Sequence, residues 1–213
     1  MELSVWLTFF VASWAISISP GAGAVAAMSA GLNHGFARGY VMTAGLILGI
    51  WTQVLVVGFG LGALIAASSI AFAAVKWLGV AYLLWLGVQQ WRAPAQPLVA
   101  EVTETALAHK TEVSTKTLIL RGWAINAVNP KGTLFLLAVV PQFLDLSRPL
   151  GWQYLVIGAT VGFTDLVVMA GYTALAAKVL HLLKTPSQMR LLNRVFGSLF
   201  VAAAVLLATF KRV

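Results

Sequence analysis

Long apolar runs, separated by short polar stretches, dominate the pattern of this 213-residue chain. The runs are continuous rather than alternating, and they reach the roughly 20 residues that an α-helix needs to cross a bilayer. Lipid offers no hydrogen-bond partner to backbone groups, so only helices or closed barrels span it. A barrel strand would alternate apolar and polar positions, and these runs do not. The pattern therefore predicts an all-α integral membrane protein of about six transmembrane helices.

The apolar runs also predict how the chain is divided. The six spans are expected at about residues 3–28, 40–67, 71–91, 117–143, 150–180 and 191–210, with a short glycine-rich link at 31–39. Residues 92–116 hold two prolines, three glutamates and three basic residues, which predicts an exposed cytoplasmic loop. The chain thus has a first three-helix unit (1–91), this polar loop (92–116) and a second three-helix unit (117–213).

The two units resemble each other in sequence. Pro20 and Pro130 each interrupt the first span of a unit and are 110 positions apart. Further matches follow in collinear order at offsets of 113 and 118: Gly45 and Gly49 with Gly158 and Gly162, and Lys76–Gly79 with Arg194–Gly197. Because three spans are an odd number, the second unit would enter the membrane from the opposite side, giving two inverted repeats. Such repeats are a recurring architecture of transporters.

Composition and charge narrow the class of protein further. The chain is 60% hydrophobic and 9% charged, whereas a soluble domain carries about a quarter charged residues. The net charge of +8 favours cytoplasmic loops beside anionic lipid over nucleic-acid binding. Nine basic residues lie near the loops after the odd-numbered spans and four on the other side, which predicts periplasmic termini. The chain has no cysteine, and no cofactor or metal site is predicted.

The two prolines are expected to break their helices. A proline lacks an N–H, so Pro20 would leave the carbonyl of Ile16 without its helical partner, and Pro130 that of Asn126. Broken backbone at membrane depth is tolerated only where protein or a water-filled cavity satisfies it. One proline could be a mere kink, but two at equivalent positions favour a binding site. Its predicted residues are Ser19, Pro20, Gly21, Asn126, Asn129, Pro130 and Lys131.

Three polar side chains near the second break have more than one possible role. Asn126 and Asn129 share a helix face and could either line the site or hydrogen-bond to neighbouring helices. Lys131 could snorkel to the interface, or face the interior and meet an acid or a substrate carboxylate. Asp165 is the one acid well inside a span, so it is the candidate for proton coupling. The alternative for Asp165 is a fixed ion pair with Lys131.

Several motifs recur here in the order and at the length typical of one family. They are Ser19-Pro20-Gly21, the glycines at 31, 35, 39, 45 and 49, the stretch Gly79–Gly87, Asn126–Lys131 and Pro141-Gln142-Phe143. Over nearly its whole length the chain resembles the LysE/RhtB family of bacterial amino-acid exporters. Ala22 stands where many members have a second proline, which predicts a milder first break. The resemblance implies a transporter rather than an enzyme, with efflux of an amino acid or close derivative across the inner membrane, driven by the proton gradient.

These observations together lead to a functional hypothesis, with alternatives left open. The chain would be a proton antiporter with alternating access about a cavity between its halves, exchanging protons for its amino-acid substrate. A neutral amino acid is favoured, because a lone acid leaves a second cationic group without a carboxylate. The alternatives are an exporter of divalent cations, which should need several acids or soft ligands, and a non-transporting assembly subunit. Glycine-rich helix faces would also permit a homodimer.

Overall fold

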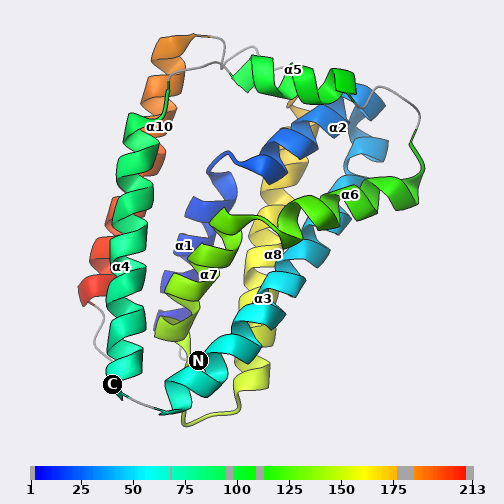
Figure 1. Cartoon of the computed structure of the whole chain (residues 1–213). Coiled ribbons are helices and arrows are strands. Elements are labelled where there is room, and N and C mark those ends of the chain that lie inside the picture. Colours follow the sequence, from blue (N-terminus) through cyan, green and yellow to red (C-terminus); the bar gives the residue numbers. More distant parts are fainter. Residues whose placement is uncertain (1–2, 68, 95–97, 109–112, 177–184, 210–213) are drawn as a thin grey trace.

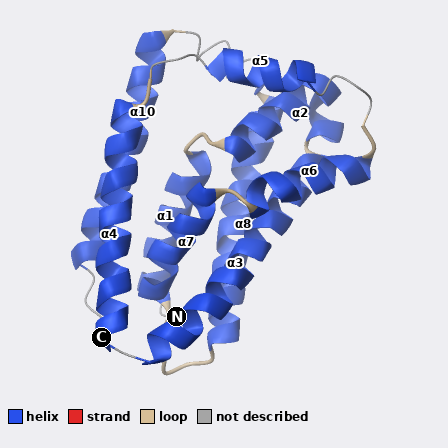
Figure 2. Ribbon diagram, viewed as in Figure 1, coloured by secondary structure: helices blue, strands red, loops and turns tan. Residues whose placement is uncertain are grey.

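The computed structural model is built of helices, with no strand in the residues it describes, which are 3–67, 69–94, 98–108, 113–176 and 185–209 (Figures 1 and 2). The first half contains α1 (Leu3–Ile18), α2 (Ala22–Gly39), α3 (Val41–Ala67) and α4 (Ser69–Arg92). A short helix, α5 (Leu98–Ala108), follows. The second half contains α6 (Thr115–Ala127), α7 (Pro130–Phe143), α8 (Leu150–Ala174) and α10 (Pro186–Thr209).

Both predicted breaks are present, and they are nearly equal. The axes of α1 and α2 differ by 56° and those of α6 and α7 by 54°. The first break is therefore not milder, although Ala22 replaces a proline. The first break includes Gly21, which has an extended backbone and directly precedes α2 as its N-cap residue. The second break lies at Val128 and Asn129, directly before Pro130, where the ring's fixed φ suits the first position of α7.

The helices support a membrane-spanning chain, while the count of six spans stays a prediction. Residues Val41–Gly60 of α3 and all of α8 are long and apolar enough to cross a bilayer, and each bent pair passes the same test together. That gives up to four spans by length and composition among the described residues. Helices α4 and α10 have 24 residues each, or about 36 Å. The predicted ends of the fifth and sixth spans, at residues 180 and 210, lie outside the described residues.

Two predicted loops prove to be helical. The glycine-rich link, 31–39, continues α2, which bends at Gly35, a residue with a φ of 70° in the left-handed region. Gly31 instead serves packing, since a Cβ there would lie 2.4 Å from the backbone oxygen of Thr173 on α8. The predicted exposed loop contains α5. Its Val102 and Ala106, one turn apart on one face, are buried, and the helix packs against α2.

Small residues allow the closest helix contacts. Along the α3–α6 contact, a Cβ on Gly45 would lie 2.0 Å from the carbonyl oxygen of Ile119, and one on Gly122 would lie 2.4 Å from that of Met42. Helices α4 and α10 run side by side (Figure 1), with the backbones of Gly87 and Gly197 in similar proximity. Without a hydrophobic driving force between helices in lipid, such close packing is a main source of their association. Aromatic and aliphatic side chains fill the space between α1, α7 and α8, where Phe9, Phe135 and Ile157 are fully buried.

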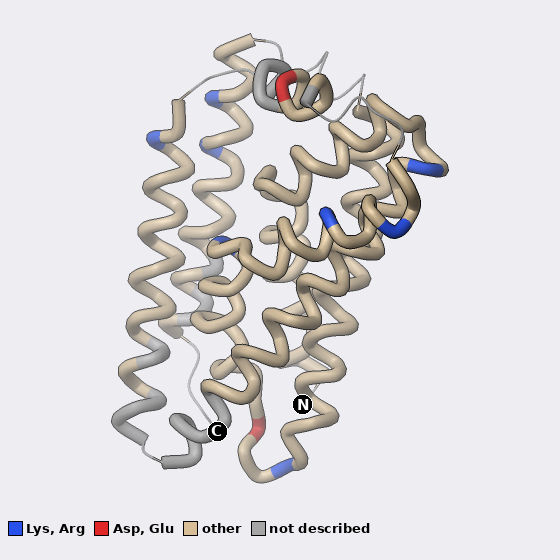
Figure 3. The backbone as a smooth tube through the Cα atoms, turned by 45° about the vertical axis from the view of Figure 1, so that its right-hand side comes forward, with Lys and Arg blue, Asp and Glu red and all other residues tan. Residues whose placement is uncertain are grey.

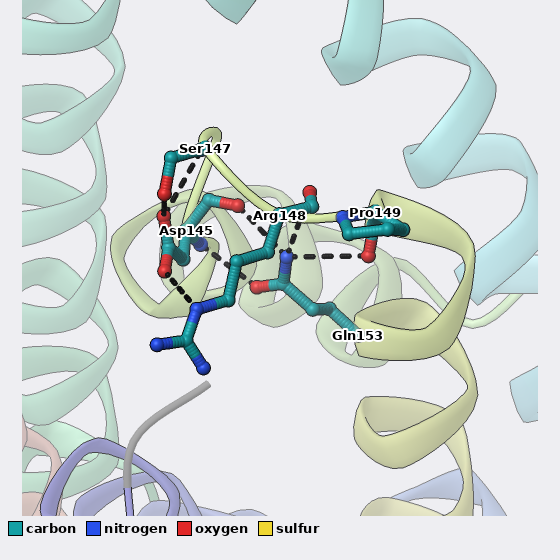
Figure 4. A network of polar contacts seen from close by, with 5 residues as sticks. All are labelled: Asp145, Ser147, Arg148, Pro149 and Gln153. Carbon is teal, nitrogen blue, oxygen red and sulfur yellow. Dashed lines mark hydrogen bonds and ion pairs between the residues drawn. The ribbon is translucent and has the colours of Figure 1, made fainter.

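The turn between α7 and α8 is fixed by one buried amide (Figure 4). The side chain of Gln153 accepts a hydrogen bond from the backbone N–H of Asp145 and donates to the Asp145 carbonyl, each at 2.8 Å. The Asp145 carboxylate in turn accepts from the hydroxyl and backbone N–H of Ser147, and pairs with Arg148 at 3.1 Å. These hydrogen bonds from Ser147, with the Arg148 charge, hold the pKa of Asp145 below its usual value. The carboxylate therefore stays ionised at neutral pH, where it holds this turn.

Candidate functional site

A cavity of about 70 Å³ lies between the two helix breaks, lined by residues of α1, α2, α3, α6, α7 and α8. Six of the predicted site residues line it: Ser19, Gly21, Asn126, Asn129, Lys131 and Asp165. The two prolines do not; Pro130 is exposed on the first turn of α7. The prolines therefore shape the site, and their neighbours supply its polar groups.

Lys131, in the second half of the chain, hydrogen-bonds to the backbone at the first break. Its Nζ donates to the carbonyl oxygen and hydroxyl of Ser19, at 2.9 and 2.8 Å, and to the carbonyl of Pro20 at 3.3 Å. These bonds occupy all three ammonium hydrogens. They also place a positive charge at the C-terminal end of α1, where the helix dipole is negative. Lys131 thus faces the interior, but it meets backbone carbonyls and a hydroxyl rather than an acid.

Asp165 faces the same cavity from α8 and is half-buried. Within the described residues, no ion pair of 4 Å or less joins Asp165 to Lys131, so the fixed pair considered above is not formed in this conformation. The helix that carries Asp165 is held against α1 by hydroxyl groups. Thr164 and Ser17 share a hydrogen bond of 3.0 Å, and Tyr172 donates to the Ile18 carbonyl at 2.6 Å.

The asparagines at the second break both line the cavity and hold the backbone. The Asn126 amide donates to the carbonyl of Leu46 on α3 at 2.8 Å, and its oxygen accepts from Asn129 at 3.2 Å. The side-chain oxygen of Asn129 accepts from the backbone N–H of Lys131 at 3.1 Å, which caps α7. Helix-to-helix bonding, one of the two roles open for Asn126, is therefore observed.

Gln53 is a site residue that the sequence interpretation missed. Its buried amide, on α3, donates to the carbonyls of Asn126 and Asn129. Pro130 deprives the Asn126 carbonyl of its α-helical partner, but this carbonyl accepts from the backbone N–H of Asn129 at 3.0 Å, and Gln53 adds a hydrogen bond from another helix. Its side chain also lies against Gly132, where a Cβ would be 2.7 Å from the Gln53 oxygen. A single amide inside the apolar run of α3 was the signal that could have identified it.

The two helix starts that follow the breaks differ in one respect. Helix α7 is capped by the Asn129 side chain, whereas Gly21 at the start of α2 offers no side-chain cap. The first N–H groups of a helix have no partner within it and carry a partial positive charge. Gly21, Gly23 and Ala24 line the cavity, so the first turn of α2 presents such groups beside it. An anionic group is favoured there.

The cavity therefore combines an acid, an uncapped helix start and an ammonium that is already bonded. This set of groups suits a small molecule carrying one negative and one positive charge. In the described part of the chain, no group of three or more His, Asp or Glu side chains could hold a metal ion.

Comparison with known proteins identifies a family for the chain. The LysE type translocator family matches residues 14–210. A membrane protein of Vibrio cholerae whose function is uncharacterized is 41% identical, covering 99% of this chain and 100% of the relative. A homoserine/homoserine lactone efflux protein of Salmonella typhi is 39% identical over 99% of both chains. A leucine efflux protein of Enterobacter sp. (strain 638) is 30% identical over 97% of this chain and 96% of its own length. No solved structure matches. The chain belongs to the LysE-type translocator family, and so to a family of bacterial membrane transporters rather than enzymes.

Proposed function

We propose that this protein exports a small neutral amino acid, or a close derivative, in exchange for protons. The observation that carries the proposal is the cavity between the two breaks, with the uncapped start of α2 and the carboxyl of Asp165 on its wall. The names of the relatives support the substrate class. Homoserine and leucine each have one amino group and one carboxylate, and an uncharged side chain.

The substrate binds with its two charged groups apart. Its carboxylate accepts hydrogen bonds from the first turn of α2, and its ammonium approaches Asp165. Lys131 adds a positive charge near the carboxylate while its hydrogens hold the end of α1. Asn126, Asn129 and Gln53 keep the second break in shape, so the substrate meets a preorganised wall.

Proton coupling follows from competition at Asp165. The carboxylate binds either a proton or the substrate ammonium, so release of one accompanies binding of the other. A substrate with a second cationic group finds no second acid on the described cavity wall, which favours a neutral amino acid. The two bent helices then open the cavity alternately to the two sides of the membrane.

The distribution of charge supports an orientation with periplasmic termini in the inner membrane. In Figure 3 most of the described basic residues gather at the end of the molecule that carries α5. Arg148 belongs to the turn between α7 and α8 (Figure 4), which lies at the opposite end (Figure 1). The start of α1 and the end of α10 lie at that opposite end (Figure 1). The positive-inside rule then assigns α5 to the cytoplasm. A homodimer is also proposed, although Gly45, Gly87 and Gly122 pack within the chain rather than at a free surface.

Flux measurements in proteoliposomes test the proposal. Purified protein is reconstituted, a pH gradient is imposed, and labelled homoserine, leucine, lysine and divalent metal ions are offered in turn. We expect the gradient to drive homoserine or leucine, and neither lysine nor the metal ions. Movement of metal ions alone would support the cation exporter, and no flux at all would support a non-transporting subunit.

The assignment of Asp165 is tested in the same vesicles with Asp165→Asn. The amide keeps the shape of the carboxyl but cannot exchange a proton, so accumulation driven by the gradient should fall at least tenfold. The protein should still fold, which size-exclusion chromatography checks. Asp145→Asn, in the turn between α7 and α8, is the matched control and should keep its proton-driven flux. Unchanged coupling in Asp165→Asn would overturn the assignment.

A further inference from the structure

A second cavity lies at the α5 end of the molecule, between α2, α5 and α6. Its volume is about 210 Å³, three times that of the cavity between the breaks. The wall is partly apolar, from Ala26, Ala30 and Leu118, and partly polar, from Asn33 and Arg121. Nothing in the transport scheme above uses this space.

Arg121 is the most informative residue of this wall. It is half-buried on α6, and its guanidinium has no hydrogen bond or ion pair with any residue in the part of the chain that the structure describes. Two other basic side chains of the molecule have hydrogen-bond partners: Arg38 donates to the carbonyl of Val113, and Lys131 donates to three oxygens. A guanidinium has five N–H donors in a planar fork that matches a carboxylate. A half-buried fork of this kind, facing a cavity, is suited to an anionic ligand.

Residues of α2 and α6 line both cavities. On α2, Ala24 lines the cavity between the breaks and Ala26 lines the second one; on α6, the neighbours Asn126 and Ile125 are divided in the same way. The two cavities therefore lie on different faces of the same two helices, because residues one or two positions apart on a helix do not share a face. Helix α5 contributes Thr105 to the wall and is tied to α2 by a hydrogen bond of 2.8 Å from the Asn33 amide to the Ala106 carbonyl. In Figure 1, α5 lies across this end of α2.

We propose that this cavity is a first binding site for the amino acid on the cytoplasmic side, where Arg121 binds its carboxylate before it moves to the cavity between the breaks. The inference rests on the proposed function, because it names the site at which that substrate is first selected. The described wall of the second cavity carries no Asp or Glu, so a second cationic group would meet only the positive charge of Arg121. Basic amino acids are thus disfavoured at this site.

Transport by Arg121→Gln tests the site against a matched control. Glutamine keeps a polar side chain but removes the charge, while Lys116→Gln removes a charge from an exposed position of the same helix. With labelled homoserine offered from the cytoplasmic side, we expect the KM to rise about tenfold in Arg121→Gln while the maximal rate is retained. In Lys116→Gln both should stay within twofold of the unchanged protein. Homoserine lactone, which lacks a free carboxylate, should lose no affinity in Arg121→Gln.

Chemical labelling tests the same site without transport. The chain has no cysteine, so Ser29→Cys places a single thiol on the cavity wall. An anionic methanethiosulfonate should modify this thiol faster than a cationic one, and homoserine should slow the reaction. Adding Arg121→Gln should remove both effects. A thiol at Thr103, exposed on α5 and outside the cavity, should show no protection by homoserine.

The outcomes separate this inference from the proposed function. Equal KM values for Arg121→Gln and Lys116→Gln, with active transport, would overturn the site at Arg121 and leave the exporter intact. Protection of Ser29→Cys by homoserine that depends on Arg121, without transport, would support the site and overturn the exporter. Labelling that is insensitive to reagent charge and to homoserine would overturn the site whatever the flux.

Discussion

At the scale of single residues, the breaks are held by side chains from other helices. Lys131 of α7 binds the open end of α1, and Gln53 of α3 binds the carbonyls at the end of α6. Lys131 donates to the carbonyls of Ser19 and Pro20 at the end of the broken helix, whereas Gln53 adds a bond to carbonyls that also accept from backbone N–H groups. Buried carbonyls without such partners would cost about 1–3 kcal/mol each. These two residues are therefore expected to be structural even when no substrate is bound.

Replacing Lys131 by methionine tests that expectation. Methionine has a similar length but no donor, so the carbonyls of Ser19 and Pro20 lose their partner. We expect the free energy of unfolding to fall by about 1–3 kcal/mol, measured by titration with a denaturing detergent in the absence of substrate. Lys116→Met, at an exposed position of α6, should be nearly neutral. Equal stability of the two variants would mean that Lys131 acts only on the substrate.

The sequence indicated the interior position of Lys131 but not the groups that it binds. An interior position for Lys131 follows from its depth in an apolar run, because an exposed ammonium there is costly. Its bonds to Ser19 depend on how α1 and α7 cross, which no local pattern encodes. The role of Gln53 was missed because a single amide in an apolar run forms no repeating pattern that would mark it.

At the scale of helices, composition alone was a poor guide to loops. The glycines at 31–39 were interpreted as a link, but Gly31 and Gly39 let helical backbones approach each other, and only Gly35 has a left-handed φ. Residues 92–116 were interpreted as a loop because they are polar. They contain Val102 and Ala106 one turn apart, which is enough to bury one face of α5 on α2. Polarity predicted the exposure of Thr103 and Glu104 correctly and missed the buried face.

The close contact of α3 with α6 can be tested with two glycines of one helix. A Cβ on Gly45 would lie 2.0 Å from a carbonyl oxygen of α6, and the contact is with backbone, which cannot rotate away. Gly45→Ala should lower the free energy of unfolding by about 1–3 kcal/mol despite the better helix propensity of alanine. Gly60→Ala is the matched control, because a Cβ there meets nothing within 4 Å, and it should be neutral or slightly stabilising. Equal destabilisation of both variants would show that the packing of α3 on α6 is not as described.

At the scale of the whole molecule, the paired breaks are what the sequence predicted best. Proline acts through its own covalent structure, so Pro20 and Pro130 mark their breaks without any knowledge of the fold. The near equality of the two bends supports a common design for the halves, while the groups at the breaks differ: α7 is capped and α2 is not. Which half would bind the substrate carboxylate therefore depends on capping geometry. The sequence motifs alone favoured the second half, which carries Asn126, Asn129 and Lys131.

Orientation in the membrane determines which cavity a substrate meets first, and single cysteines can establish it. Thr103 is exposed on α5, and Gly151, near the turn between α7 and α8, is exposed with open space where a Cβ would be. In intact cells, a membrane-impermeant maleimide should label Gly151→Cys, whereas Thr103→Cys should react only after the inner membrane is opened. The unmodified chain, which has no thiol, is the control for background labelling. Labelling of Thr103→Cys alone in intact cells would reverse the orientation, so the cavity at Arg121 would then face the exit. Labelling of both would mean that the chain inserts in two orientations, which an excess of basic residues at the α5 end should prevent.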